Sequence, residues 1–139
     1  MTSEFVHLHN HSDYSLLDGA QRVDQLVNTI DDLNMDSLAL TEHGNMFSVV
    51  PFYQKAKKAG INPIIGCETY VAVGSRHDKK LQAGGGWGNN HLILLVQNQV
   101  GYENLMKLVT AGYLEGFYYR PRIDMDLLEK HSEGLVCLS

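Results

Sequence analysis

The sequence predicts an α/β fold with a parallel sheet or barrel. Short apolar runs typical of buried strands recur along the 139 residues, and segments with helical spacing of apolar residues separate them. Because parallel neighbours need crossover connections, which helices supply, this alternation favours parallel pairing. A composition of 44% hydrophobic and 19% charged residues is that of an ordinary globular protein, so we expect one domain over residues 1–139.

Five segments have the pattern of buried strands, because short apolar runs are bounded by turn signals. The second run leads directly into Thr41-Glu42-His43-Gly44, so polar side chains are expected on a turn just past its end. The third run carries one carboxylate, Glu68, inside the strand. The strands are expected to begin at Phe5 and then to span residues 37–40, 64–73, 91–96 and 135–138.

Four segments are predicted to be helices, because apolar residues recur three or four positions apart with polar residues between them. In the second helix Pro51 lies near the first turn and Gly60 follows the last residue, the usual asymmetry of helix ends. Residues 74–90 are polar and glycine-rich, which predicts a loop or hairpin tip. The expected helices span residues 22–33, 48–59, 101–114 and 125–131.

Composition and termini limit the possible functions. The N-terminus lacks the basic-then-apolar order of a signal peptide, and the apolar runs are too short to cross a bilayer, so we expect a cytoplasmic protein without membrane contact. A net charge of −5 argues against nucleic-acid binding by bulk electrostatics, although bound cations would add positive charge. Cys67 and Cys137 are expected to be reduced core residues rather than a disulfide.

Histidines gather near the N-terminus. His7, His9 and His11 alternate with other residues, so an extended chain would direct them to one face. Because chemistry in parallel α/β folds collects where strands end, His9 and His11 are expected to meet Glu42 and His43 at one rim. Imidazole and carboxylate ligands together suit Zn²⁺, Mn²⁺ or Fe²⁺. The pattern therefore predicts a metal site.

Glu68 and His91 would reach the same rim if their two strands paired antiparallel across the glycine-rich loop. A bridging carboxylate such as Glu68 would suit a site with several metals, and clustered divalent cations usually act on phosphate esters. The sequence contains no phosphate-binding GxxxxGK[ST] loop, no dinucleotide fingerprint and no GxSxG serine elbow.

Charged and aromatic residues near the C-terminal half have simpler explanations. Arg120 and Arg122 could contact a DNA backbone, but exposed charges are usually only solvated, and we favour that interpretation. The aromatic residues that precede them are expected to pack rather than to form a base-stacking platform: Tyr113, Phe117, Tyr118 and Tyr119.

Five blocks of sequence have a distinctive order: HLHNHSDYSLLDGA, LALTEHGNM, AKKAGINPIIGCETYV, HLILLVQNQVGYENL and YYRPRIDMDLLEKHSEGLVCLS. Together they resemble the PHP (polymerase and histidinol phosphatase) domains at the N-terminus of bacterial replicative DNA polymerase III alpha subunits. The resemblance runs from Phe5 to Ser139. The paired histidines indicate only the PHP superfamily, whereas YSLLDG, GYENL and the C-terminal block indicate the polymerase branch.

The resemblance implies a distorted (β/α)₇ PHP barrel, of which this chain supplies the first part, and a site for up to three zinc or manganese ions. His7 and Glu42 would be neighbours of that site, and Glu42 stands where the family commonly has Asp. The remaining ligands of the family, a cysteine and a later Asp-x-His, would fall beyond Ser139, so the 139-residue chain alone is expected to be inactive. The implied metal ligands in this chain are His9, His11, Asp18, His43, Glu68 and His91.

The resemblance also implies a role in DNA replication. The parent would be a magnesium-dependent DNA polymerase whose partners are DNA, deoxynucleotides, a sliding clamp and a proofreading exonuclease subunit. Its PHP site would be either a metal-dependent 3′–5′ exonuclease or a metal-stabilised scaffold that docks the exonuclease subunit. A stand-alone phosphoesterase of the histidinol-phosphatase kind is the alternative.

Overall fold

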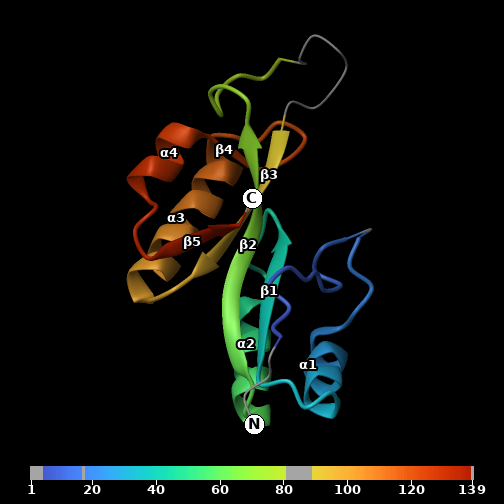
Figure 1. Cartoon of the computed structure of the whole chain (residues 1–139). Coiled ribbons are helices and arrows are strands. Elements are labelled where there is room, and N and C mark those ends of the chain that lie inside the picture. Colours follow the sequence, from blue (N-terminus) through green and yellow to red (C-terminus); the bar gives the residue numbers. More distant parts are fainter. Residues whose placement is uncertain (1–4, 17, 81–88, 139) are drawn as a thin grey trace.

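The computed structural model of the chain describes residues 5–16, 18–80 and 89–138 (Figure 1). Strands and helices alternate through most of these residues, as predicted. In chain order the elements are α1 (Val23–Asp32), β1 (Ser37–His43), α2 (Val49–Ala59), β2 (Asn62–Ala72), β3 (Asn89–Val96), α3 (Gln99–Leu114), β4 (Arg122–Ile123), α4 (Met125–Lys130) and β5 (Leu135–Leu138).

The long strand β2 lies at the centre of a mixed sheet. Its first part pairs in parallel with β1, and its second part pairs antiparallel with β3 on the opposite edge. β4 pairs in parallel with β2 beyond the end of β1, and β5 pairs antiparallel with β3. The predicted parallel pairing is therefore correct for β1 with β2 and wrong for β5, and the short strand β4 was not predicted. The pairing of β2 with β3 is the antiparallel one that would bring Glu68 and His91 together. A hairpin connects β2 to β3, so no crossover helix is needed there.

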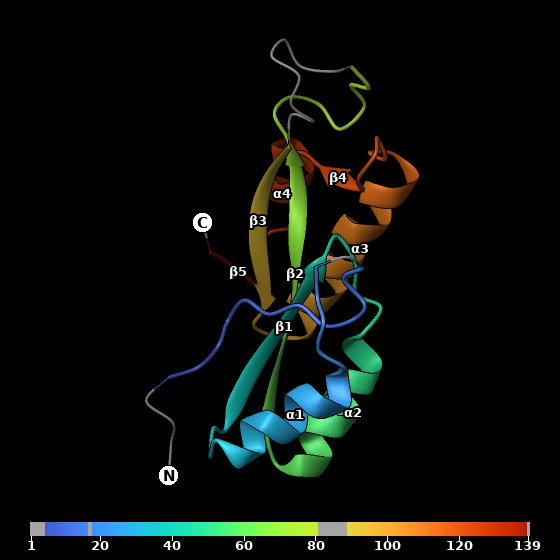
Figure 2. The ribbon, with the colours of Figure 1, turned by 90° about the vertical axis from the view of Figure 1, so that its right-hand side faces the viewer.

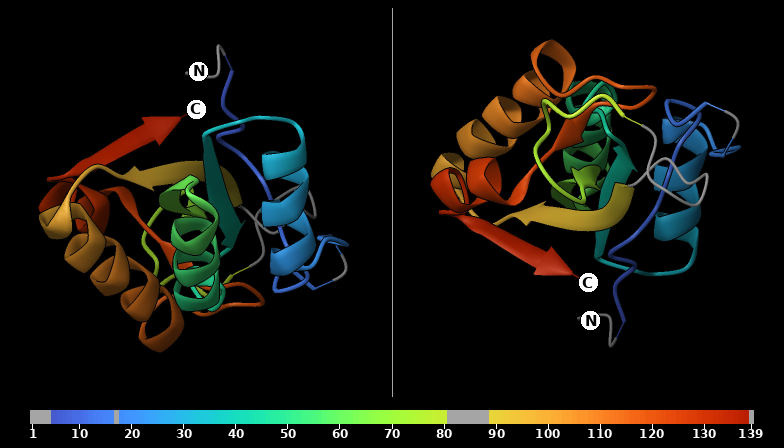
Figure 3. Two further views of the ribbon diagram at one scale, coloured as in Figure 1. Left: turned by 90° about the horizontal axis from the view of Figure 1, so that it is seen from below. Right: turned by 90° about the horizontal axis from the view of Figure 1, so that it is seen from above.

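Two apolar clusters hold the helices against this sheet. In the first, α1 and α2 pack on β1; α1 contributes one buried stripe of four apolar residues, as its amphipathic pattern predicts. In the second, α3 and α4 pack on β2, β3 and β4. Figure 3 looks along β2 and shows α1 and α3 on opposite sides of it. The carboxyl end of β1 is largely buried, with Thr41 0% and Glu42 1% exposed.

The opening segment is not a strand, contrary to the prediction. It runs beside the edge of β1 that β2 leaves free (Figure 2). The Ala39 N–H donates to the His7 carbonyl, and the Thr41 N–H donates to the Asn10 carbonyl; each N···O distance is 2.9 Å. The two acceptors are three residues apart on the opening segment, whereas the two donors are two residues apart on β1. A regular ladder cannot keep that register.

Other boundaries agree closely with the prediction. The four helices and β5 begin and end within two residues of the expected positions. Gly60 ends α2 with a left-handed backbone (φ 79°), as expected for a helix C-terminus. β1 runs to His43 instead of ending at Leu40, because it keeps pairing with β2. Part of the predicted loop, residues 81–88, lies outside the described residues. Within the described part of the chain, no helix has the length and apolar character needed to span a membrane.

Asp124 links the C-terminal helix to the hairpin. Its side chain accepts from the Leu127 N–H (3.1 Å), which caps α4, and pairs with the Arg76 guanidinium at 2.9 Å. Burial would raise the pKa of Asp124, but hydrogen bonds from Arg76 and Leu127 outweigh burial and lower it. Asp124→Ala removes the cap of α4 and the charged hydrogen bonds with Arg76, which keeps Glu115 as a partner at 2.6 Å. We expect a loss of about 2–3 kcal/mol in the free energy of unfolding, measured by urea denaturation at pH 7.

The pH dependence provides a second test of this contact. A carboxylate with a lowered folded pKa contributes stability above its unfolded pKa of about 3.9, and that contribution is lost as the pH falls through the folded value. The difference between wild type and Asp124→Ala should therefore shrink below about pH 4. Glu129→Ala, an exposed residue of α4, is the control and should change stability by less than about 0.5 kcal/mol. An equal loss in both variants would contradict the assignment.

Candidate metal centre

Glu68 is the centre of a cluster of histidines. It lies in the middle of β2, is 4% exposed, and pairs with His43 of β1. Its Oε2 atom contacts His9 Nε2 and lies 2.8 Å from His11 Nε2. Its Oε1 atom lies 2.5 Å from His91 Nδ1. The antiparallel pairing of β2 with β3 brings His91 to this position, as the sequence suggested.

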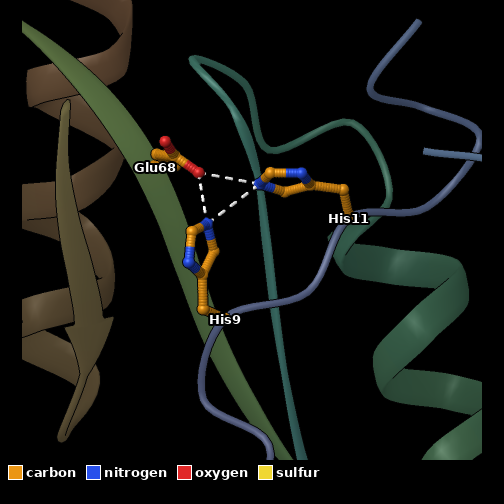
Figure 4. A group of neighbouring side chains, drawn as sticks. All are labelled: His9, His11 and Glu68. Carbon is orange, nitrogen blue, oxygen red and sulfur yellow. Dashed lines mark hydrogen bonds and ion pairs between the residues drawn. The ribbon is translucent and has the colours of Figure 1, made fainter. Parts of the chain in front are cut away.

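His9, His11 and Glu68 form the first of three groups whose ligand atoms lie within 4.8 Å of one another. Figure 4 shows both imidazoles, from the opening segment, directed at the carboxylate. The two Nε2 atoms are 3.2 Å apart. Both rings thus present nitrogen atoms to the same carboxylate oxygen, although the segment that carries them is irregular.

Asp18 joins the cluster from the turn that precedes α1. Its Oδ2 atom lies 2.8 Å from His11 Nδ1 and 2.6 Å from His43 Nε2, which forms the second group. The third group consists of His43, Glu68 and His91. Neighbouring groups share His11, His43 or Glu68, so the structure brings all six predicted ligands into one continuous centre.

The chemistry of this donor set fits divalent cations. His43 Nδ1 is buried and has no hydrogen-bond partner among the described residues, and it lies 3.8 Å from Glu68 Oε2. A buried polar atom without a partner is costly unless a ligand satisfies it. Four imidazoles and two carboxylates match the ligands that Zn²⁺ and Mn²⁺ accept.

Electrostatics keep both carboxylates ionised. Burial raises the pKa of Glu68, but hydrogen bonds from His9, His91 and His11 together outweigh burial, and the pKa lies below its usual value. Hydrogen bonds from His43 and then His11 lower the pKa of Asp18. The ionised form is the one that binds a cation.

His7 and Glu42, the two predicted neighbours of the site, have different surroundings. The exposed His7 ring contacts Phe5, with centroids 4.7 Å apart, and belongs to none of the three groups. Glu42 is 1% exposed. Its carboxylate accepts hydrogen bonds from three serine hydroxyls, those of Ser12, Ser15 and Ser48.

The sequence analysis missed these serines. Ser15 Oγ also accepts from the His43 N–H (3.0 Å), so Glu42, through Ser15, holds the backbone of one candidate ligand. The available signal was Glu42 itself, because a carboxylate in a buried strand needs donors nearby. Ser12 and Ser15 reach Glu42 only through the path of the opening segment, and Ser48 reaches it from the start of α2.

Tyr70 contacts two of the candidate ligands, His43 and His91, and the sequence did not predict this role. Its ring stacks on His43 (5.9 Å, 18°) and meets the edge of His91 (4.9 Å, 88°). Gly44 makes room for it: this residue has φ 62°, and a Cβ there would lie 3.1 Å from the Tyr70 ring. Two candidate ligands are thereby oriented by one side chain.

A cleft of about 1110 Å³ opens beside the centre. Asp18, His43 and His91 line one part of it. Tyr113, Phe117 and Tyr119, which were expected to pack, are 38%, 48% and 57% exposed, and each ring contacts another aromatic ring. The aromatic side chains that line the cleft are Tyr14, Phe47, Tyr70, Tyr113, Phe117 and Tyr119.

Comparison with known proteins agrees with this architecture. A DNA polymerase III subunit alpha from Borreliella burgdorferi is 57% identical over 137 residues, which are 99% of this chain and 12% of that protein. The corresponding protein of Thermus aquaticus is 46% identical over 98% of this chain and 11% of its own length. The chain thus spans about one eighth of the length of these curated relatives.

Solved structures share the fold at lower identity. An amidohydrolase from Chromobacterium violaceum superposes with a TM-score of 0.54 and 22% identity over 76% of this chain and 32% of its own. A Bifidobacterium adolescentis protein described as a metal-dependent phosphoesterase superposes with a TM-score of 0.55 and 14% identity over 81% of this chain and 34% of its own. The predicted α/β fold, part of a PHP barrel, is confirmed. Residues 7–139 match the PHP domain family, and the chain belongs to that family.

Proposed function

We propose that this chain is the N-terminal PHP part of a bacterial DNA polymerase III alpha subunit and that its centre is a metal-dependent phosphoesterase acting as a 3′–5′ exonuclease on DNA. The gathering of six nitrogen and oxygen ligands into three groups, two of which share the buried Glu68, supports this proposal most directly. The high identity to polymerase alpha subunits supports the replication role.

Each group of ligands would hold one divalent ion, zinc or manganese, with Glu68 shared between two positions. Bound there, the ions would supply charge stabilisation to the phosphodiester and activate a water molecule. The chain's own residues prepare this chemistry. Glu68 and Asp18 stay ionised because histidine hydrogen bonds lower the pKa of both carboxylates. Tyr70 fixes the ring planes of His43 and His91.

The intact polymerase, of which this chain would be the N-terminal part, would have further activities and partners. The intact polymerase would add deoxynucleotides with magnesium at an active site outside this chain. It would work in the cytoplasm with DNA, a sliding clamp and a proofreading exonuclease subunit. The 139-residue chain alone would have little or no activity.

The test uses the full-length alpha subunit purified free of other subunits. His9→Ala combined with His43→Ala removes one ligand from each of the three groups. We expect bound zinc or manganese to be lost and hydrolysis of a single-stranded oligonucleotide to fall by about 100-fold or more. His7→Ala, the neighbouring exposed histidine outside the groups, is the matched control and should retain both.

Two outcomes would contradict the exonuclease assignment. If wild type binds metal but degrades no DNA, while the double variant loses metal and thermal stability, the centre is a scaffold for another subunit. If wild type hydrolyses histidinol phosphate but not DNA ends, it is a phosphatase for small molecules.

A further inference from the structure

The cleft beside the metal centre has an exposed aromatic wall. Phe47, Tyr113 and Phe117 line it and are 64%, 38% and 48% exposed. Phe47 comes from the β1–α2 connection, Tyr113 lies in the last turn of α3, and Phe117 lies three residues past its end. Two segments distant in the sequence thus supply aromatic rings to the same surface. Large exposed aromatic surfaces of this kind commonly mark binding sites.

The rings of this wall form a continuous series. The centroids of Phe47 and Tyr113 are 6.3 Å apart with planes at 45°, and those of Tyr113 and Phe117 are 6.3 Å apart with planes at 28°. None of the three is among the buried residues that form the two apolar clusters. The wall can therefore offer aromatic surface to flat groups of a ligand without unpacking the core.

A cation, Arg120, also lines the cleft. The Arg120 guanidinium sits over the Tyr70 ring at 5.7 Å, and Tyr70 stacks on His43. Arg120 is exposed, and none of the carboxylates in the described residues forms an ion pair with it. It thus offers positive charge to an anion in the cleft, in a chain whose net charge is −5.

The size of the cleft also limits the ligand. Pockets for single small molecules commonly enclose about 300–1,000 Å³. The volume of this cleft, about 1110 Å³, lies just above that range. A cleft larger than a single small molecule needs suits a polymer end better than a single sugar phosphate.

We propose that this cleft binds the end of a single-stranded DNA chain. This proposal rests on the proposed function and adds the place where the substrate binds. The bases stack on Phe47, Tyr113 and Phe117, and a backbone phosphate lies at Arg120. The terminal phosphodiester then faces His43, which borders both the cleft and the metal centre. Because every base has an aromatic face, such a wall binds without sequence preference.

The kinetic test compares two substrates on the full-length alpha subunit. Phe47→Ala with Phe117→Ala should lower kcat/KM for a single-stranded oligonucleotide by about 5- to 150-fold, the range expected when stacking of one base is lost. Hydrolysis of an abasic oligonucleotide of the same length, which keeps the phosphodiesters but has no aromatic group, should stay within about twofold. Tyr53→Ala, an exposed aromatic residue on α2 that does not line the cleft, is the control and should leave both rates unchanged.

A second measurement separates this inference from the proposed function. An oligonucleotide with 5-iododeoxyuridine at its 3′ end should photocrosslink to peptides containing Phe47, Tyr113 or Phe117, identified by mass spectrometry. Crosslinks at these residues without any metal-dependent hydrolysis would support the cleft and overturn the exonuclease. Hydrolysis that the double variant leaves unchanged, with crosslinks only elsewhere, would overturn the cleft and leave the exonuclease standing.

Discussion

Glu68→Gln should remove metal from more than one position of the centre at once. Glu68 belongs to two of the three ligand groups, and each of its oxygens contacts different histidines. Glutamine keeps nearly the same shape but has no charge, so both positions lose their anionic ligand. Because zinc or manganese binding also stabilises the folded state, the rise in thermal midpoint on adding metal should disappear.

The measurement is metal content after dialysis, together with the thermal midpoint with and without added zinc or manganese. We expect the bound metal to fall by at least half and the metal affinity by about 100-fold or more. Glu129→Gln makes the same chemical change at an exposed site outside the groups and should behave as wild type. Full metal occupancy in Glu68→Gln would show that the carboxylate is not a ligand.

Glu42→Ala should be the most destabilising single substitution near the centre. The carboxylate is 1% exposed and accepts from three serine hydroxyls and from the Ser12 N–H. Alanine leaves these donors buried without an acceptor and opens a cavity. We expect the free energy of unfolding to fall by about 3–5 kcal/mol, measured as the urea midpoint of the metal-free protein.

Metal affinity distinguishes positioning from stability alone. Ser15 joins Glu42 to the His43 N–H, so a change at Glu42 should also displace a candidate ligand. Glu42→Gln, which retains some of these bonds, should be folded and still lose about 10-fold in metal affinity. Glu133→Ala, an exposed glutamate, is the control. Unchanged affinity in a folded Glu42→Gln would limit this residue to stability.

Local patterns were sufficient for most elements of the fold. The buried stripe of α1, the Gly60 end of α2 and the short strand β5 were predicted within two residues. These features depend on interactions within one or two turns of the chain, and such interactions are visible in residue spacing. The six candidate ligands were predicted by combining spacing with resemblance to a family, and the structure brings those six side chains together.

Contacts between distant segments of the chain decided the features that residue spacing did not predict. The opening segment looked like a strand, but its register against β1 prevents a ladder. The direction of β3, the serines around Glu42 and the exposure of Phe117 also depend on how distant segments meet. Residue types and local periodicity thus determined the helices and most of the strands, and together with the family resemblance they indicated the candidate ligands. Only the tertiary structure decided which side chains share a carboxylate or line a cleft, because those contacts join residues far apart in the sequence.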